Sequence, residues 1–256
     1  MSCGIIRISR AALVAGLYTL ATSPLSAANM PKDFVYLRDV DPSIEQDMRY
    51  ASADNFTAEP VPGYDAAECV LVREVAEALK AAQATLKPMG LSLKVYDCYR
   101  PAQAVAAFVA WARKPVSPQA KLAYYPELPK SDLFPDYIAT KSGHSRGATV
   151  DLTLVKLGSS PETDGAADSV ACNAEPSGND LDMGVGFDCF DPKANTDAPN
   201  LAPGQRRNRE LLLEVMSRHG FKNYPKEIWH YTFQPEPYPD TYFDFPIRPR
   251  STDGKK

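Results

Sequence analysis

Residues 142–155 read SGHSRGATVDLTLV and join a flexible turn to a strand. Gly143 and Gly147 let the first half of this stretch turn, because glycine adopts backbone angles that other residues avoid. Residues 148–155 are rich in β-branched side chains, which predicts a strand. Asp151 lies within that strand, so its carboxylate can point back toward the turn and the histidine in it.

Helical and strand-like segments alternate on both sides of this strand. Apolar residues recur at helical spacing in residues 66–86, and Pro88 and Gly90 are expected to end that helix. We expect the remaining elements at four places: a strand at 91–95, a helix from 101 to 111, a helix from 204 to 219 and a strand at 229–233.

The connections between these elements are long and irregular. Residues 115–140 hold many Pro, Tyr and Asp, and residues 157–200 form a long loop rich in Gly, Asp, Asn and Pro. A Pro-rich tail from Pro235 is expected to wrap the surface. Such connections do not suit a doubly wound sheet, so we predict an α+β fold with a small, mostly antiparallel sheet flanked by helices.

The 256-residue chain has an ordinary globular composition, with 44% apolar and 23% charged residues. This composition excludes a wholly disordered chain and a coiled-coil or collagen-like rod. No composition break divides residues 29–256, so we predict a single domain there. A chain of this length buries a core without help, so any metal is expected to be functional rather than structural.

Residues 1–28 have the pattern of a secretory signal peptide. Arg7 and Arg10 are their only charged side chains, a short apolar run follows, and small residues end the segment. Because the apolar run is short for a membrane span, we expect cleavage near Ala27 or Ala28; a retained anchor is the alternative. The mature protein would then be exported, to the periplasm or the medium, with no stable membrane insertion.

Removal of this segment makes the protein more acidic. Lys and Arg fall from 28 to 26 against 32 acidic residues, so the net charge changes from −4 to −6. This acidity argues against a nucleic-acid partner, which would bind a basic surface. The sequence leaves the oligomeric state open.

Four cysteines remain after cleavage, because Cys3 lies in the signal segment. An even number of cysteines in an exported protein predicts two disulfides. Of the three possible pairings we favour Cys69–Cys98 and Cys172–Cys189, since both close short loops. The alternative is free thiols buried as small apolar groups.

Two of the three histidines have neighbours that suit a metal site. His144 precedes Asp151 in the stretch quoted above, and His230 opens the later predicted strand. Two imidazoles and one carboxylate are a ligand set of catalytic zinc, with the fourth position left for water; a structural His–Asp pair is the alternative. His219 lies in the last turn of a predicted helix, where a cation suits the macrodipole, and we interpret it as structural.

A carboxylate and a guanidinium could complete the chemistry of such a site. Glu227 lies three residues before His230 and could pass a proton from a metal-bound water to a leaving amine, if a turn before the strand joins them. A solvated surface pair is the alternative. Arg100 precedes Pro101, which favours extended backbone, and could stabilise an oxyanion. Its alternative role is an ion pair with a structural carboxylate such as Asp97.

Together these segments resemble the VanX-type D-alanyl-D-alanine dipeptidases, zinc enzymes of the hedgehog-like D,D-peptidase group (peptidase family M15, subfamily D). The resemblance covers most of residues 29–256. Besides residues 142–154 it includes these runs in the same order: Tyr-Arg-Pro at 99–101, Met-Gly at 183–184, Phe-Asp at 187–188, Gln-Arg-Arg-Asn-Arg at 205–209, Glu-Ile-Trp-His at 227–230, Glu-Pro-Tyr-Pro at 236–239 and Tyr-Phe-Asp-Phe-Pro at 242–246. Several such runs in one order are a specific signal.

The resemblance implies one zinc ion per chain and a role for each site residue. These roles are zinc ligand for His144, Asp151 and His230, general base for Glu227, and stabiliser of the transition state for Arg100. Ser142 and Asp188 take the positions that contact substrate, and Asp188 would neutralise the ammonium of a dipeptide. The alternatives are a turn hydroxyl for Ser142 and an Asx turn for Asp188.

Three residues depart from the pattern of the family. Ile228 stands next to the implied base where Trp is usual, and it is expected to reshape the pocket wall and so affect substrate preference. Thr149 stands where Ala is usual. Cys98 stands where Gly is common, which agrees with a disulfide added for an oxidising compartment.

The implied function is zinc-dependent hydrolysis of D-alanyl-D-alanine to two D-alanines, in peptidoglycan dipeptide turnover or nutrient recovery. One alternative is a zinc D,D-carboxypeptidase that trims longer peptidoglycan peptides, which an open groove near Asp188 would favour. Another is a non-catalytic zinc-containing wall-binding module, against which Glu227 argues, because binding alone requires no base. Whether the 157–200 loop is a lid or a surface wrap stays open.

Overall fold

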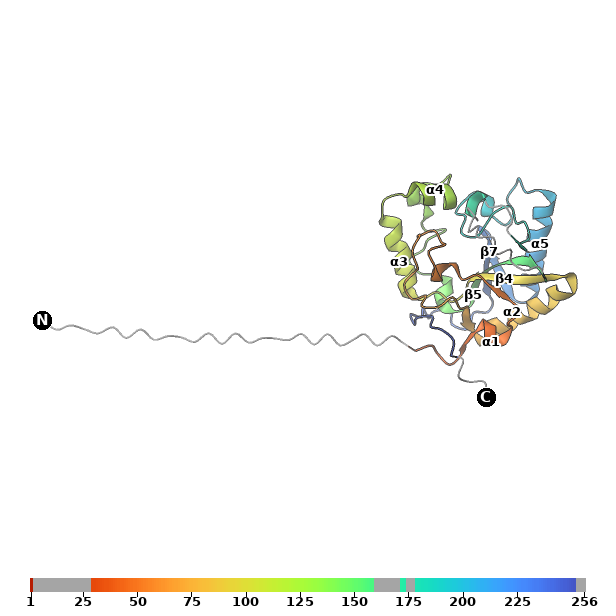
Figure 1. Cartoon of the computed structure of the whole chain (residues 1–256), viewed down its shortest axis with the longest axis horizontal. Coiled ribbons are helices and arrows are strands. Elements are labelled where there is room, and N and C mark those ends of the chain that lie inside the picture. The colour runs from red at the N-terminus through yellow and green to blue at the C-terminus, as the bar shows by residue number, and fades with distance from the viewer. Residues whose placement is uncertain (2–28, 159–170, 174–177, 252–256) are drawn as a thin grey trace.

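The computed structural model describes residue 1 and residues 29–158, 171–173 and 178–251 (Figure 1). The predicted signal peptide therefore lies outside the described residues, except for Met1. So does part of the predicted 157–200 loop. In the part of the chain that is described, no helix has the length and apolarity that a membrane crossing requires.

The centre of the fold is a five-stranded sheet in the order β2-β4-β5-β7-β6. Its strands are β2 (Glu45–Gln46), β4 (Leu91–Asp97), β5 (Thr149–Lys156), β6 (Phe221–Tyr224) and β7 (Glu227–Phe233). Strands β2 and β4 pair in parallel, and the other three neighbouring pairs are antiparallel. A second, antiparallel sheet joins β1 (Phe34–Tyr36) to β3 (Val70–Val72).

Helices lie on two sides of these strands. They are α1 (Leu37–Val40), α2 (Arg73–Leu86), α3 (Ala102–Arg113), α4 (Pro118–Tyr124) and α5 (Pro203–Arg218). Short 3₁₀ helices lie at Arg49–Ala51, Lys87–Met89, Lys130–Leu133, Gly143–Arg146, Ala171–Asn173 and Pro192–Ala194. In Figure 1, α2 and α5 lie on one side of the strands and α3 and α4 on the other. The predicted α+β fold, with a mostly antiparallel sheet flanked by helices, is confirmed.

Helix α2 packs through one apolar face. Val75, Leu79, Ala82 and Leu86 are fully buried and recur at spacings of four and three, with the fully buried Ala76 beside Val75. Gly90, in the left-handed region at φ 71°, then turns the chain into β4 as predicted. The predicted start at residue 66 is wrong, because residues 70–72 pair with β1 as β3 before the helix begins.

Other boundaries differ from the sequence prediction in smaller ways. Helix α3 continues to Arg113, and β7 begins at Glu227 rather than at residue 229. Residues 115–140 are not wholly irregular, because α4 forms there. The hydroxyl of Ser117 caps α4 by accepting a hydrogen bond from the N–H of Ala120.

The Pro-rich tail is more than a surface wrap. Phe245 and Ile247 are buried in the core. The Tyr99 hydroxyl donates to the carbonyl of Phe245 and accepts from its N–H, at 3.0 and 2.9 Å. The tail therefore holds the chain that follows β4, where the Tyr-Arg-Pro run lies.

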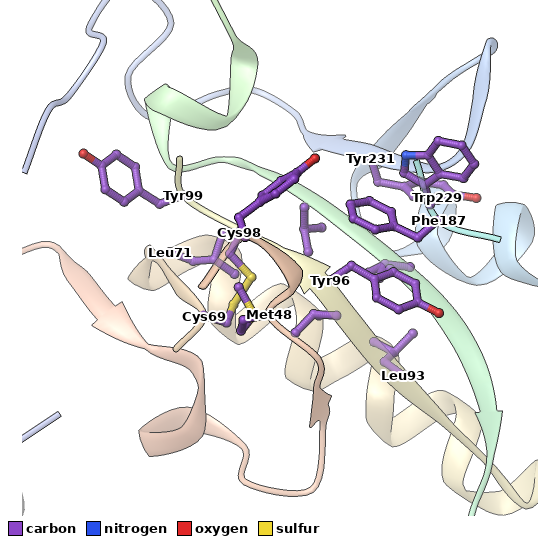
Figure 2. Close-up of a cluster of buried hydrophobic side chains, with 14 of the residues drawn as sticks. Met48, Cys69, Leu71, Leu93, Tyr96, Cys98, Tyr99, Phe187, Trp229 and Tyr231 are labelled. Carbon is purple, nitrogen blue, oxygen red and sulfur yellow. A yellow bond between two sulfur atoms is a disulfide. The ribbon is translucent and has the colours of Figure 1, made fainter. Parts of the chain in front are cut away.

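Figure 2 shows part of the hydrophobic core, to which both β4 and β7 contribute side chains. Tyr96 stacks on Phe187 with ring centroids 4.7 Å apart, and Phe187 meets Trp229 edge-on at 5.8 Å. The disulfide Cys69–Cys98 joins the residue before β3 to the residue after β4. The second bridge is Cys172–Cys189, so both favoured pairings are confirmed.

Candidate metal centre and active site

His144, Asp151 and His230 converge on one point. His144 Nε2 lies 3.3 Å from Asp151 Oδ2 and 3.3 Å from His230 Nδ1, while His230 Nδ1 lies 3.1 Å from Asp151 Oδ1. One ligand atom from each lies within 4.8 Å of the others. The buried Oδ1 of Asp151 makes no hydrogen bond. A buried, unsatisfied carboxylate oxygen beside two imidazole nitrogens fits a bound cation, and this donor set suits zinc.

The register of the sheet brings Asp151 and His230 together. They are cross-strand partners in the antiparallel pair β5–β7, which places their side chains side by side. Asp151 therefore lies within its strand as predicted, whereas His230 lies in the middle of β7 rather than at its start.

His144 reaches the centre from the 3₁₀ helix that precedes β5. Gly147 ends this turn at φ 74°, and a Cβ there would lie 2.3 Å from the ring of Phe34, so only glycine fits. His144 Nδ1 lies 2.8 Å from the carbonyl oxygen of Cys98, to which its N–H donates. That hydrogen bond orients the ring and leaves the Nε2 lone pair for a metal.

The position of Arg100 agrees with both roles that the sequence offered, an ion pair with Asp97 and a place beside the metal-ligand set. Its Nε and Nη2 lie 2.9 and 2.8 Å from Asp97 Oδ2, so the alternative ion pair is present. Its Nη2 also lies 3.6 Å from Asp151 Oδ2, and the guanidinium packs over the ring of Tyr50 at 5.2 Å. Arg100 is thus held by Asp97 while facing the metal centre.

Asp97 supports the site in a way that the sequence did not reveal. Its Oδ1 accepts a hydrogen bond from the Tyr64 hydroxyl at 2.6 Å, and its Oδ2 lies 3.4 Å from His144 Nδ1. Burial raises the pKa of Asp97, and the nearby charges of Arg100 and His144 oppose that rise. Its position three residues before Arg100 was the available signal.

Glu227 is the first residue of β7, so the turn that was expected to join Glu227 to His230 does not lie between them. The pairing of β6 with β7 shifts register at Tyr224, which pairs with Glu227. In a regular strand, residues three apart point to opposite faces. The irregularity instead places Glu227 Oε2 3.3 Å from His230 Nδ1. Burial raises the pKa of Glu227 well above its usual value, and the charge of Asp151 adds to the rise.

Asp188 is buried in the same site, 4% exposed, with its backbone in the left-handed region at φ 63°. The Tyr50 hydroxyl lies 3.0 Å from both carboxylate oxygens. Burial raises the pKa of Asp188 well above its usual value, and Asp151 adds to the rise. Sequence reasoning missed Tyr50, which lies 138 residues from Asp188 and in none of the motifs.

Ser142 takes the alternative role that was offered for it. Its hydroxyl accepts a hydrogen bond from the N–H of His144 at 3.2 Å and so caps the turn. Ser142 also lines the cavity described next, so a contact with substrate stays a prediction.

These groups line one cavity of about 230 Å³. It contains Arg100, Asp188 and Glu227 beside the His–Asp–His centre, and its remaining walls include the aromatic rings of Phe108 and Trp229. Ile228 is buried in the core instead of lining the cavity. The expected direct effect of Ile228 on the pocket wall is therefore wrong.

His219 lies apart from this cavity, between α2 and α5. Its Nε2 is 2.8 Å from the Thr85 hydroxyl oxygen. Burial and the neighbouring charge of Arg218 lower the pKa of His219, which disfavours the cation that the macrodipole argument considered. Its position agrees with a structural role.

Comparison with known proteins gives matches along nearly the whole chain. The family model described as D-ala-D-ala dipeptidase (Peptidase_M15) matches residues 30–167 and 158–248. A D-alanyl-D-alanine dipeptidase of Streptomyces coelicolor is 38% identical over 219 residues, which are 85% of this chain and 100% of the relative. One of Enterococcus faecium is 35% identical over 216 residues, which are 84% of this chain and 98% of the relative.

A solved structure shows a weaker likeness. It is a vancomycin resistance D,D-pentapeptidase, VanY, in complex with Zn(II), which is 17% identical with a TM-score of 0.33 and covers 64% of this chain and 73% of its own. The resemblance drawn from the motifs is confirmed by the family match and by the dipeptidase relatives. This chain belongs to the D-ala-D-ala dipeptidase family of M15 peptidases.

Proposed function

We propose that this chain is an exported zinc dipeptidase that hydrolyses D-alanyl-D-alanine to two molecules of D-alanine. One observation carries the proposal: a single small cavity holds the metal-ligand set, a buried carboxylate for an ammonium, and a carboxylate with a guanidinium for proton transfer and charge stabilisation. Family membership and the names of the relatives support this substrate.

His144, Asp151 and His230 would hold the zinc ion, with a position left open for a further ligand. When bound, zinc supplies a Lewis acid and lowers the pKa of a coordinated water to ~7. The contacts of His144 with Cys98 and Asp97 keep its Nε2 directed at Asp151 and His230, where the metal would bind.

Asp188 is proposed to bind the free ammonium of the dipeptide. Its carboxylate is buried and is held by the Tyr50 hydroxyl, so it awaits a compensating positive charge. A peptide with a blocked amine would leave this carboxylate buried and unpaired, which disfavours such a substrate.

Glu227 is proposed to accept a proton from the attacking water at Oε2 and to deliver it to the leaving nitrogen. Burial raises the pKa of Glu227, and a raised pKa strengthens a carboxylate as a proton acceptor. Arg100, held by Asp97, offers Nη2 to the negative charge that develops on the peptide carbonyl oxygen.

The size of the cavity favours a dipeptide over a longer peptide. Pockets for drug-sized ligands are ~300–1,000 Å³, and this cavity is about 230 Å³. Asp188 lies buried in the wall of this cavity. A D,D-carboxypeptidase was expected to have an open groove near Asp188 instead.

Export is supported by the signal-peptide pattern of residues 1–28 and by the two disulfides. An exported enzyme would act on dipeptide released from peptidoglycan or present as a nutrient. Cell fractionation with N-terminal sequencing tests this. A periplasmic or secreted protein that starts near residue 28 or 29 supports export, and a full-length cytoplasmic protein contradicts it.

Release of free D-alanine tests the activity. Purified mature protein is offered D-alanyl-D-alanine and, separately, an N-acetylated peptide that ends in D-Ala-D-Ala, each with zinc and with a chelator. We expect cleavage of the free dipeptide alone, lost with the chelator. Cleavage of the blocked peptide would show a carboxypeptidase, and cleavage of neither would overturn the proposed function.

A further inference from the structure

The run Gln205–Arg209 has no place in the chemistry proposed above, yet helix α5 uses it to hold the segment that carries Asp188. We call residues 182–195 the Asp188 segment. Asn208 and Arg209 follow Gln205 by three and four residues, so each lies beside Gln205 on the helix surface of α5. All three side chains donate hydrogen bonds to the Asp188 segment.

Arg209 makes the most extensive of these contacts. It is 1% exposed, and its guanidinium donates to three backbone carbonyls: from Nε to Met183 at 2.7 Å, from Nη1 to Asn195 at 2.5 Å, and from Nη2 to Lys193 at 3.0 Å. Met183 and Lys193 lie equally far along the chain on either side of Asp188. One rigid guanidinium therefore ties the two ends of the loop that bears Asp188.

The electrostatics of Arg209 are unusual for a structural residue. Its hydrogen bonds go to backbone carbonyls, no ion pair with a carboxylate is found for it among the residues described, and burial lowers its pKa to about 10. The charge of Asp182 opposes this lowering of the pKa only in part. Burying a cation that donates only to backbone carbonyls is costly, and an apolar side chain of similar size would fill this space without that cost. A charged side chain at this buried place indicates that its role is to fix the positions of the three carbonyls to which it donates.

Gln205 and Asn208 hold the start of the Asp188 segment. Gln205 Nε2 donates to Asp182 Oδ2 at 3.0 Å, and Asn208 Nδ2 donates to the carbonyl of Asp182 at 2.8 Å. The chain approaches the helix closely here, because a Cβ on Gly184 would lie 2.9 Å from Gln205 Oε1. Gly184 also has a φ of 76°, so the tight turn requires glycine.

We propose that Gln205, Asn208 and Arg209 position Asp188 for the substrate ammonium and thereby determine the specificity for a free amine. They are positioning residues, because they act through Asp188. This inference rests on the proposed dipeptidase function. The hydrogen bonds of Arg209 do not reach the metal-ligand set, so disturbing Arg209 is expected to weaken ammonium binding while zinc stays bound.

The test compares Arg209→Met with the matched control Arg207→Met, since Arg207 is exposed on the same helix. We expect Arg209→Met to raise KM for D-alanyl-D-alanine by about 10- to 100-fold, as small displacements of binding groups do. The kcat is expected to change little, because ammonium binding acts equally on substrate and transition state. Arg209→Lys keeps the charge and is expected to restore part of the loss, and Arg207→Met is expected to behave as the wild type.

A ligand without the ammonium separates positioning from general damage. N-propionyl-D-alanine keeps the shape and carboxylate of the dipeptide but lacks its amino group. Its inhibition constant and the zinc content are expected to be the same in Arg209→Met and the wild type. An unchanged KM, or equal weakening of both ligands, would overturn the proposal. If Arg209→Met does not fold, the half-buried Asn208→Ala is judged by the same criteria.

Amide hydrogen exchange measured without substrate keeps this inference distinguishable from the proposed function. Faster exchange in Arg209→Met, confined to residues 182–195, supports the positioning role, and exchange equal to that of Arg207→Met contradicts it. If the wild type fails to cleave D-alanyl-D-alanine, the proposed function is wrong. Hydrogen exchange alone then tests whether α5 positions the Asp188 segment.

Discussion

At the scale of single residues, the proposed roles separate the side chains that would hold the metal from the side chain that would move a proton. His144, Asp151 and His230 make up the ligand set, while Glu227 lies beside it, 3.3 Å from the His230 ring nitrogen. This separation means that metal content and turnover respond differently to substitution, and each assignment has its own measurement.

Glu227→Gln is expected to lower kcat by about 10²- to 10⁴-fold, the usual contribution of a positioned general base. Zinc is expected to stay bound, because Gln keeps the shape of the side chain and Glu227 is outside the ligand set. Metal analysis and D-alanine release on the same preparation measure both effects. Loss of zinc together with activity would contradict the assignment of Glu227 as the base.

His144→Ala is expected to lose zinc, because one of the two imidazole ligands disappears. Metal analysis after dialysis against a weak chelator measures the loss, with the wild type beside it. Full retention of zinc would remove His144 from the ligand set, although its hydrogen bond to Cys98 would still place it in the site.

At the scale of elements, the turn before β5 is held by a close approach of backbone to side chain. Gly147→Ala is expected to destabilise the protein by at least about 2 kcal/mol, because strain and overpacking add. The matched control is Gly90→Ala, which has a similar φ of 71° but no atom within 4 Å of the added Cβ. Urea unfolding of both variants measures the difference, and equal losses would show that the contact with Phe34 is unimportant.

The contact between α2 and α5 is predicted to be structural. His219→Ala is expected to leave zinc content and kcat unchanged and to lower the stability by about 1 kcal/mol, through loss of the hydrogen bond to Thr85. A large drop in activity at unchanged stability would contradict this interpretation.

The same contact carries a pH dependence with a defined sign. Because the folded protein lowers the pKa of His219 below 6.5, the unfolded chain binds more protons as the solution becomes acidic. The contribution of His219 to stability is therefore present above pH 6.5 and is lost as the pH falls. Urea unfolding at pH 8 and pH 5 is expected to show a smaller difference between wild type and His219→Ala at pH 5.

At the scale of the whole molecule, the two disulfides close loops with sequence separations of 29 and 17 residues. Replacing both cysteines of either bridge by alanine is expected to cost about 3–4 kcal/mol, because the unfolded chain regains loop entropy. Urea unfolding of each double variant measures this cost. Wild type unfolded with a reductant is the control, and an equal stability with and without reductant would contradict a stabilising role.

From the sequence alone we could predict the α+β class, strand β5 and helices α3 and α5. The sequence favoured two disulfide pairings that the structure then showed. It also offered His144, Asp151 and His230 as a ligand set, and the structure brings these three side chains together. The helices and strands can be inferred from a pattern within one segment, whereas the ligand set and the pairings were inferred from side-chain chemistry, the family resemblance and loop length. Periodicity reports burial of one face, and the chemistry of His and Asp is visible without knowing their neighbours.

Only the tertiary structure showed the strand pairings and side-chain contacts that join residues far apart in the sequence. Residues 70–72 form β3 because β1 pairs with them, despite a helix-like local pattern. Glu227 faces His230 because a register shift breaks the alternation of β7. Tyr50 meets Asp188, and Arg209 holds the loop around it, across long stretches of chain. The physical reason is that strand pairing and buried hydrogen bonds join residues far apart in sequence, and local patterns carry no record of which partner will be near.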